Sequence, residues 1–166
     1  ELEIGLVHRL NPEDRALFTA GATRLYSVAD AVTRHLVECH GVDPDIIEHH
    51  GEMVDVIAIV EATSALDDAE RRGQDRRSKG LDPDHFVVGA CGTVEFRKGT
   101  DLFLQMAWHI HHAETSKPVT FVWVGGDEAG IARATARAAE LGLADVAQFV
   151  GPQPDPATWF AGMDVF

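Results

Sequence analysis

Several residue types that mark large protein classes are scarce in this sequence. Only two of the 166 residues are cysteine, Cys39 and Cys91. Two thiols are too few for a disulfide framework, and they favour a reducing, cytoplasmic setting. No apolar stretch reaches the roughly 18 residues of a membrane span. No basic segment followed by an apolar one marks a secretory signal. The sequence therefore argues against a disulfide-rich secreted protein and against an integral membrane protein.

Positive charge is also scarce, with 14 Lys and Arg against 27 Asp and Glu and a formal net charge of −13. Nucleic-acid and anionic-membrane surfaces need clustered Lys and Arg, so no nucleic-acid partner is expected. Hydrophobic residues make up 45% of the chain and charged residues 25%, as in folded globular proteins. The chain starts at Glu1 and stops at Phe166 within an apolar run, so we expect a piece of a longer protein. Any membrane association would come through parts outside it.

Short apolar runs alternate with segments of helical periodicity between residues 84 and 166. Such alternation is typical of a parallel sheet with right-handed crossovers. It predicts an α/β fold, a Rossmann-like parallel sheet with helices on both faces. The predicted strands cover residues 86–90, 119–124 and 146–150, with a fourth starting at Val165, and the predicted helices follow the N-cap residues Thr100, Asp127 and Asp155.

The first part of the chain is less regular. A short helix is predicted over residues 11–20, a strand at Arg24-Leu25-Tyr26, and a helix from an N-cap at Ser27 to Gly41. This part is too small for a core of its own. Residues 61–83 have mixed charge and predict a connector helix. We interpret its four arginines as part of a solvated helix face with weak internal ion pairs: Arg71, Arg72, Arg76 and Arg77.

The loop from Gly89 to Gly99 lies between the first predicted strand and its helix. Ligands of open parallel sheets bind at the carboxyl ends of the strands, where this loop falls. Arg97 and Lys98 are the only Lys or Arg between Lys79 and Lys117. Two positive charges beside a helix N-terminus favour a phosphate site. The spacing alone equally allows two solvated loop residues, because it is neither a dinucleotide fingerprint nor a P-loop.

Two further groups of residues have both an ordinary and a functional interpretation. Gly125-Gly126-Asp127 follows the second strand and is either a tight turn with a helix cap or part of the same ligand edge. Nine histidines invite a metal hypothesis, but no metal-ligand spacing is recognisable among them, and we interpret them as surface residues.

Five motifs occur in a fixed order: residues 86–99, Asp101-Leu102-Phe103, residues 121–126, Phe149-Val150-Gly151 and residues 161–166. Their order and spacing resemble the donor-binding domain of group 1 (family 4) glycosyltransferases, which are retaining enzymes of the GT-B fold. Upstream, residues 26–32, Leu36, 41–43 and 46–51 resemble the end of that family's acceptor domain and its lead into the connector. The resemblance implies an acceptor-side tail at 1–60, a connector helix at 61–83 and an incomplete donor-binding domain at 84–166.

The resemblance implies that a nucleotide diphosphate-sugar binds at this edge, for transfer to a saccharide or lipid-linked acceptor in polysaccharide biosynthesis. Lys98 matches the family's diphosphate lysine. Thr93 stands where the family usually has an arginine, and Arg97 is a candidate to replace that arginine. The nucleobase would lie along Val150-Gly151. The implied donor-binding set is Gly92, Thr93, Arg97, Lys98, Gly125, Gly126, Val150 and Gly151.

The same resemblance leaves the catalytic residues outside this chain. The family's paired glutamates follow the strand that starts at Val165, and its glycine-rich loop and catalytic histidine region precede residue 1. We therefore expect no catalytic residue, cofactor or metal here, and no sugar transfer by this chain alone. The alternatives are a nucleotide-sugar epimerase of the same fold and a non-catalytic α/β binding module.

Overall fold

The computed structural model describes residues 16, 24–51, 56–64 and 66–166. The chain divides into two compact units, Glu1–Asp55 and Val56–Phe166, and each is described by itself. The helix predicted over residues 11–20 lies outside the described residues, apart from residue 16. Within the described ranges, no helix combines the length and the apolar character needed to cross a bilayer.

The first unit holds a two-stranded parallel sheet in which β1 (Leu25–Ser27) pairs with β2 (Ile47–His49). Between the strands run α2 (Asp30–His40) and the 3₁₀ turn η1 (Pro44–Ile46). Gly41 ends α2 as predicted, with φ 67°, a left-handed conformation that glycine adopts without strain. Ser27 is not the N-cap, because it ends β1 and donates its hydroxyl to the Ala29 carbonyl. Ala29 occupies the cap position instead.

The second unit is built on a parallel sheet of order β3-β4-β5. Its strands are β3 (Phe86–Cys91), β4 (Val119–Val124) and β5 (Ala147–Gly151), at the predicted places. Val165 forms a parallel bridge with Val88 on β3, where the fourth strand was predicted to start. The predicted α/β class with a parallel sheet is therefore confirmed.

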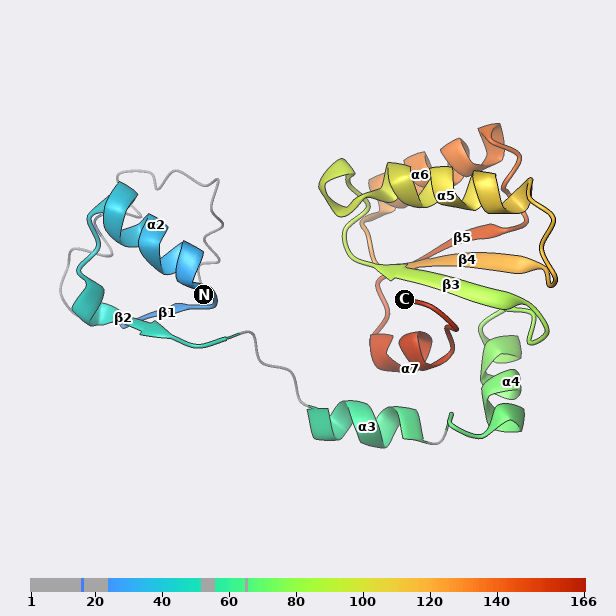
Figure 1. Cartoon of the computed structure of the whole chain (residues 1–166), viewed down its shortest axis with the longest axis horizontal. Helices are drawn as coiled ribbons and strands as arrows, with labels where there is room; N and C mark the ends of the chain where they lie inside the picture. The colour runs from blue at the N-terminus through green and yellow to red at the C-terminus, as the bar shows by residue number, and fades with distance from the viewer. Residues whose placement is uncertain (1–15, 17–23, 52–55, 65) are drawn as a thin grey trace. The chain divides into compact units, whose positions relative to one another are not determined.

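Helices cover both faces of this sheet (Figure 1). One face carries α5 (Thr100–His111) and α6 (Glu128–Glu140), and the other carries α7 (Pro156–Ala161). Successive side chains of a strand point to opposite faces, and β4 supplies both cores. Phe121 and Trp123 pack under α5 and α6, whereas Val122 and Val124 pack with Met163 on the other face. An apolar run without alternation is what a strand buried on both faces requires.

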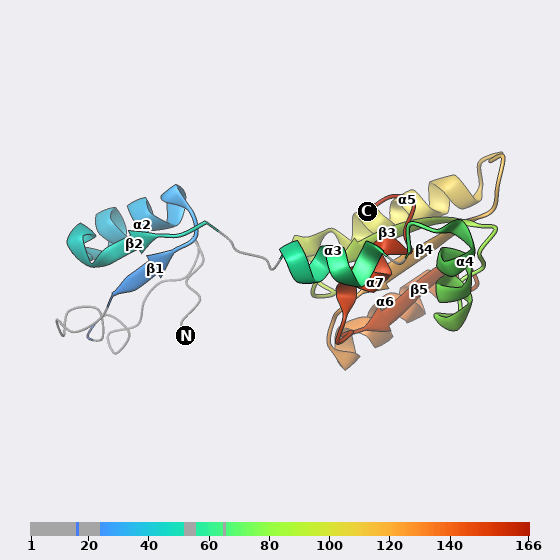
Figure 2. The ribbon, with the colours of Figure 1, turned by 90° about the horizontal axis from the view of Figure 1, so that it is seen from below.

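The residues predicted as one connector helix form parts of two helices, α3 (Val56–Ser64) and α4 (Ala69–Ser78). Both belong to the second unit, and α3 lies beside α7 (Figure 2). The assignment of the two parts to an acceptor side and a donor side stays a prediction.

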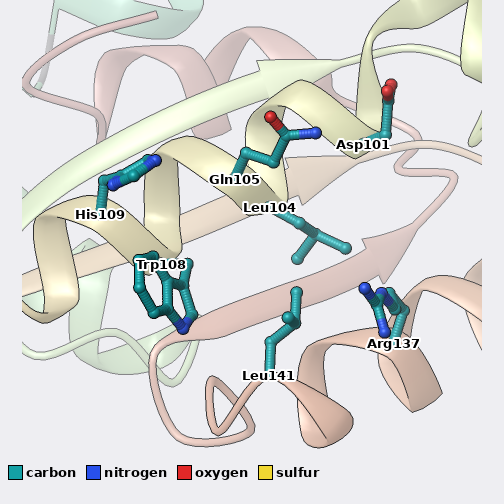
Figure 3. Close-up of a pocket in the computed structure, with 7 residues that line it drawn as sticks. All are labelled: Asp101, Leu104, Gln105, Trp108, His109, Arg137 and Leu141. Atoms are coloured by element: carbon teal, nitrogen blue, oxygen red, sulfur yellow. The ribbon is translucent and has the colours of Figure 1, made fainter.

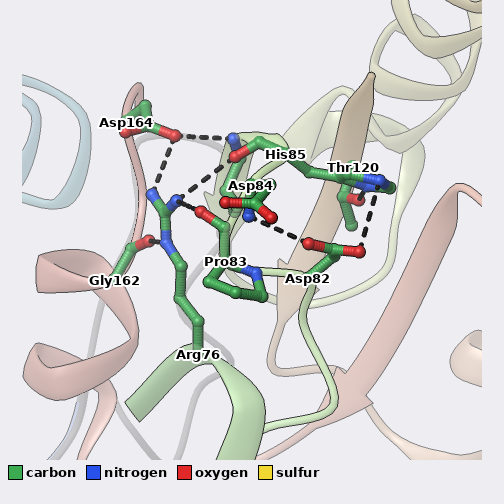
Figure 4. A network of polar contacts seen from close by, with 9 residues as sticks. Arg76, Asp82, Pro83, Asp84, His85, Thr120, Gly162 and Asp164 are labelled. Atoms are coloured by element: carbon green, nitrogen blue, oxygen red, sulfur yellow. Dashed lines mark hydrogen bonds and ion pairs between the residues drawn. The ribbon is translucent and has the colours of Figure 1, made fainter. Parts of the chain in front are cut away.

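The interpretation of Arg76 as a solvated residue was wrong. Its side chain is buried, with the residue 4% exposed, and it joins α4 to the end of the chain (Figure 4). The guanidinium donates to the carbonyls of Gly162, Pro83 and His85 and to the Asp164 carboxylate. Helical periodicity within residues 61–83 could not reveal partners so distant in the sequence.

Two helix starts differ in how they are capped. Asp127 caps α6 as predicted, since its carboxylate accepts a hydrogen bond of 2.8 Å from the Gly130 N–H. Thr100 was predicted as the cap of α5 but is its first helical residue, and Gly99, with φ 76°, holds the cap position. The buried Thr100 hydroxyl instead donates to the Glu95 carbonyl, which ties the start of α5 to the preceding loop.

Candidate functional site

Hydrogen bonds join the carboxyl ends of the three strands into one continuous edge. The Gly92 N–H donates to the Val124 carbonyl over 2.9 Å, and the Gly125 N–H donates to the Gly151 carbonyl over 2.8 Å. Gly92 follows β3, Gly125 follows β4, and Gly151 ends β5. Three glycines predicted from the sequence as site residues therefore lie next to one another.

The loops after β3 and β4 approach each other too closely for side chains. Gly125 has φ 104°, and a Cβ there would lie 2.7 Å from the Gly92 carbonyl oxygen. Gly126 has φ 98°, and a Cβ there would overlap the side chain of Val94. Backbone conformation and packing each require glycine at both positions. These two glycines are thus explained by contact between loops, whether or not they also face a ligand.

Lys98 lies over Gly92. Its aliphatic carbons are 3.4–3.6 Å from the place where a Cβ of Gly92 would be. Lys98 ends the short 3₁₀ turn η2 (Phe96–Lys98), directly before Gly99. Within the described part of the chain, no carboxylate forms an ion pair with its ammonium group. The structure therefore places an unpaired positive side chain at the carboxyl edge of the sheet.

Arg97 is oriented differently from Lys98. Its side chain is 69% exposed, and its Nε lies 4.0 Å from a carboxylate oxygen of Glu95. Among the described residues, this ion pair is the one polar contact of the Arg97 guanidinium, and it is weak because solvent screens it. The structure brings Lys98 to Gly92, whereas Arg97 extends into solvent near Glu95.

Free backbone donors accompany Lys98 on the loop. The N–H groups of Thr93 and Val94 make no hydrogen bond within the described residues, whereas the Thr93 carbonyl accepts one from Glu95. Thr93 is exposed, and Val94 buries its side chain against Gly126 and Gly130. Two consecutive unpartnered N–H groups beside an ammonium group suit an anion chemically.

The β5 end of the edge has fewer free groups. The Val150 carbonyl accepts a hydrogen bond from the Gln153 side-chain amide over 2.8 Å, and the Gly151 carbonyl accepts the one from Gly125. The Val150 side chain is half-buried and packs on the core beneath α7. This backbone is where the family resemblance implies the nucleobase.

A separate pocket lies between α5 and α6 (Figure 3). It has a volume of about 210 Å³ and an apolar lining that includes Leu104, Trp108 and Leu141, with Asp101 and Arg137 also at its walls. None of the predicted donor-binding residues lines it.

Among the described residues, no group of three or more metal-ligating side chains could hold a metal ion.

No protein-family model matches the chain. It is 32% identical over 157 residues to the D-inositol 3-phosphate glycosyltransferase of Thermomonospora curvata, a match that takes in 89% of this chain and 36% of that protein. Among solved structures, a glycosyltransferase from Rickettsia africae matches 96% of the chain with TM-score 0.72 and 15% identity. WaaG, a glycosyltransferase of lipopolysaccharide biosynthesis, matches 92% with TM-score 0.70 and 18% identity. Anabaena HepE, solved with UDP and glucose, matches 94% with TM-score 0.67 and 16% identity.

The chain has the fold of part of a GT-B glycosyltransferase. The predicted resemblance to glycosyltransferases of this fold is thereby confirmed. The chain covers 36% of the curated relative and 40–42% of these three solved structures. The epimerase and the non-catalytic module are not favoured, because the curated relative and two of the three structures are named as glycosyltransferases.

Sequence reasoning missed one residue at this GT-B edge. Trp123 was interpreted as core, and it does pack in the core, but its indole Nε1 also donates to the Gly92 carbonyl over 3.0 Å. Apolar residues surround Trp123 in the sequence, so no local pattern marks this hydrogen bond. Only the pairing of β3 with β4 reveals it.

Proposed function

We propose that this chain is the donor-binding part of a retaining glycosyltransferase. It binds a nucleotide diphosphate-sugar at the carboxyl edge of β3, β4 and β5. The acceptor is a saccharide or a lipid-linked molecule. The observation that carries the proposal is the position of Lys98, whose side chain lies over Gly92 at the edge where ligands of open parallel sheets bind.

The electrostatics of this edge support an anionic ligand. The chain has a formal net charge of −13, so a diphosphate needs local positive groups to approach it. Lys98 supplies a charge, and the Thr93 and Val94 N–H groups supply donors beside it. The N-terminus of α5, which follows directly after Gly99, adds the positive end of a helix dipole.

Calorimetry with UDP, GDP and ADP tests the proposal. At least one of these nucleotides binds, and UDP is the first choice because HepE was solved with it. Lys98→Ala weakens the affinity roughly tenfold or more, since a hydrogen bond to a charged group contributes about 1.5–3 kcal/mol. Lys117→Ala is the matched control, because Lys117 is an exposed lysine just before β4, at the amino end of the sheet.

Thermal unfolding gives an independent measurement. A nucleotide that binds only the native state increases the free energy of unfolding by RT ln(1 + [L]/Kd) and so raises the melting temperature. Failure of all three nucleotides to shift the melting temperature at millimolar concentration would contradict the proposed function. Equal affinities of the wild type and Lys98→Ala would contradict the role of Lys98 alone.

The acceptor is tested in a protein that contains both GT-B halves. D-Inositol 3-phosphate, after which the curated relative is named, is the first acceptor to try. Retention of the anomeric configuration in the product, read by NMR, checks the reaction class. An inverted product would exclude the retaining mechanism.

A further inference from the structure

The hydrogen bond from Trp123 to Gly92 joins the central strand β4 to the loop that follows β3, residues 92–99. Trp123 is 2% exposed, so water does not compete for its indole N–H. The ring is held by edge contacts with Phe103, whose centroid is 5.3 Å away, and packs beside Phe149 at 6.4 Å. A donor fixed in this way sets the direction of the Gly92 carbonyl.

The direction of that carbonyl also sets the direction of the Thr93 N–H, because both belong to one peptide group. In a trans peptide the C=O and the N–H point to opposite sides, and the described residues contain no cis peptide bond. The Gly92 oxygen points to the Trp123 indole and lies against Gly125. The Thr93 N–H therefore points away from the core, and within the described structure it has no partner.

Among the described residues, the indole is the one hydrogen-bond partner of the Gly92–Thr93 peptide group. Gly92 has φ 141°, which side-chain-bearing residues rarely adopt, and glycine can rotate to many other conformations. A phosphate oxygen beside Lys98 binds more tightly to an N–H group that already points toward it, because a preorganised donor requires no reorientation when the anion arrives. The hydrogen bond from Trp123 supplies this preorganisation.

We propose that Trp123 is a positioning residue of the phosphate site. Its indole N–H holds the Gly92–Thr93 peptide so that the Thr93 N–H donates to a phosphate oxygen of the nucleotide. Trp123 itself lies behind the loop and does not touch the ligand. This inference rests on the proposed function and extends it to a residue of the central strand.

Trp123→Phe keeps an aromatic ring in the core and removes the N–H donor. Calorimetry compares UDP with uridine, which shares the base and ribose but has no phosphate. The affinity for UDP falls roughly tenfold, as expected for one lost hydrogen bond to a charged group. The affinity for uridine stays the same.

Phe149→Leu is the control for packing, because it replaces a ring beside Trp123 with a smaller side chain and leaves the indole N–H in place. It leaves the ratio of the two affinities unchanged.

A second measurement needs no variant. In the ¹⁵N-labelled wild type, saturating UDP moves the Thr93 amide resonance strongly, and uridine does not. If the wild type binds UDP but the Thr93 amide does not move, or if Trp123→Phe keeps the wild-type ratio of affinities, the role of Trp123 is overturned and the proposed function stands. If the wild type binds no nucleotide, the proposed function and this inference fail together.

Discussion

The guanidinium of Arg76 and the carboxylate of Asp164 meet at 2.8 Å although they lie 88 residues apart in the chain. The same carboxylate oxygen accepts the Val87 N–H, also over 2.8 Å. Arg76 donates further to carbonyls that precede β3 and to Gly162 after α7 (Figure 4). This network fastens α4 and the end of the chain to the amino end of β3. It is therefore a structural contact, at the edge of the sheet opposite to the proposed donor site.

Arg76→Ala destabilises the second unit. The substitution removes the donor from three carbonyls and leaves the Asp164 carboxylate with the Val87 N–H alone. Breaking a buried ion pair in this way costs about 3–5 kcal/mol in comparable cases. Arg77→Ala is the control, because the neighbouring Arg77 is exposed and its loss changes stability by roughly 0.5 kcal/mol or less. Urea denaturation measures both. Equal effects of the two substitutions would show that the network around Arg76 contributes little.

Gly125→Ala is more destabilising than Gly142→Ala. Both glycines have positive φ, 104° and 73°, so each alanine pays for strain, about 1–2 kcal/mol in the left-handed region. A Cβ at Gly142 meets nothing within 4 Å, whereas at Gly125 it would lie 2.7 Å from the Gly92 carbonyl oxygen. The difference in unfolding free energy between the two variants reports this collision. Equal unfolding free energies of the two variants would mean that the loops after β3 and β4 can move apart without a loss of stability.

Asp127→Ala weakens the start of α6. The Asp127 carboxylate satisfies the Gly130 N–H, and loss of such a cap costs about 1 kcal/mol. Asp155 holds the N-cap position of α7 but makes no side-chain hydrogen bond there, so Asp155→Ala has the smaller effect. Thermal unfolding of the two variants checks the order.

Arg97→Ala reduces nucleotide affinity less than Lys98→Ala does. Arg97 lies mostly in solvent near Glu95, where its charge acts on a bound diphosphate through water and is screened by salt. Calorimetry at low and at physiological ionic strength separates the two residues, because the effect of Arg97 fades with added salt. A loss for Arg97→Ala as large as that for Lys98→Ala, at both ionic strengths, would place Arg97 in direct contact with the ligand.

Local patterns were sufficient for the strands of the second unit and for the start of α6. The apolar run at β4 and the cap at Asp127 each depend on residues adjacent in the chain, and both were predicted. The cap of α5 was predicted at Thr100, but the structure has Gly99 there. The Thr100 hydroxyl bonds to the Glu95 carbonyl, and N-cap propensity alone does not show whether a hydroxyl caps its helix or bonds to such a neighbouring carbonyl. The N-cap of α2 at Ala29 instead of Ser27 has the same kind of cause, because the Ser27 hydroxyl donates to the Ala29 carbonyl.

The sequence by itself determined the class of the fold, the places of the strands of the second unit, and the position of Lys98 in a glycine-bounded loop at the carboxyl edge of the sheet. Periodicity and turn residues act over a few positions, so they can be recognised without coordinates. Only the tertiary structure decided that Trp123 holds the Gly92 carbonyl, that Gly125 must lack a side chain, and that Arg76 is buried. Each of these depends on groups from different strands or helices, which only the packing of the sheet brings within hydrogen-bond or van der Waals distance.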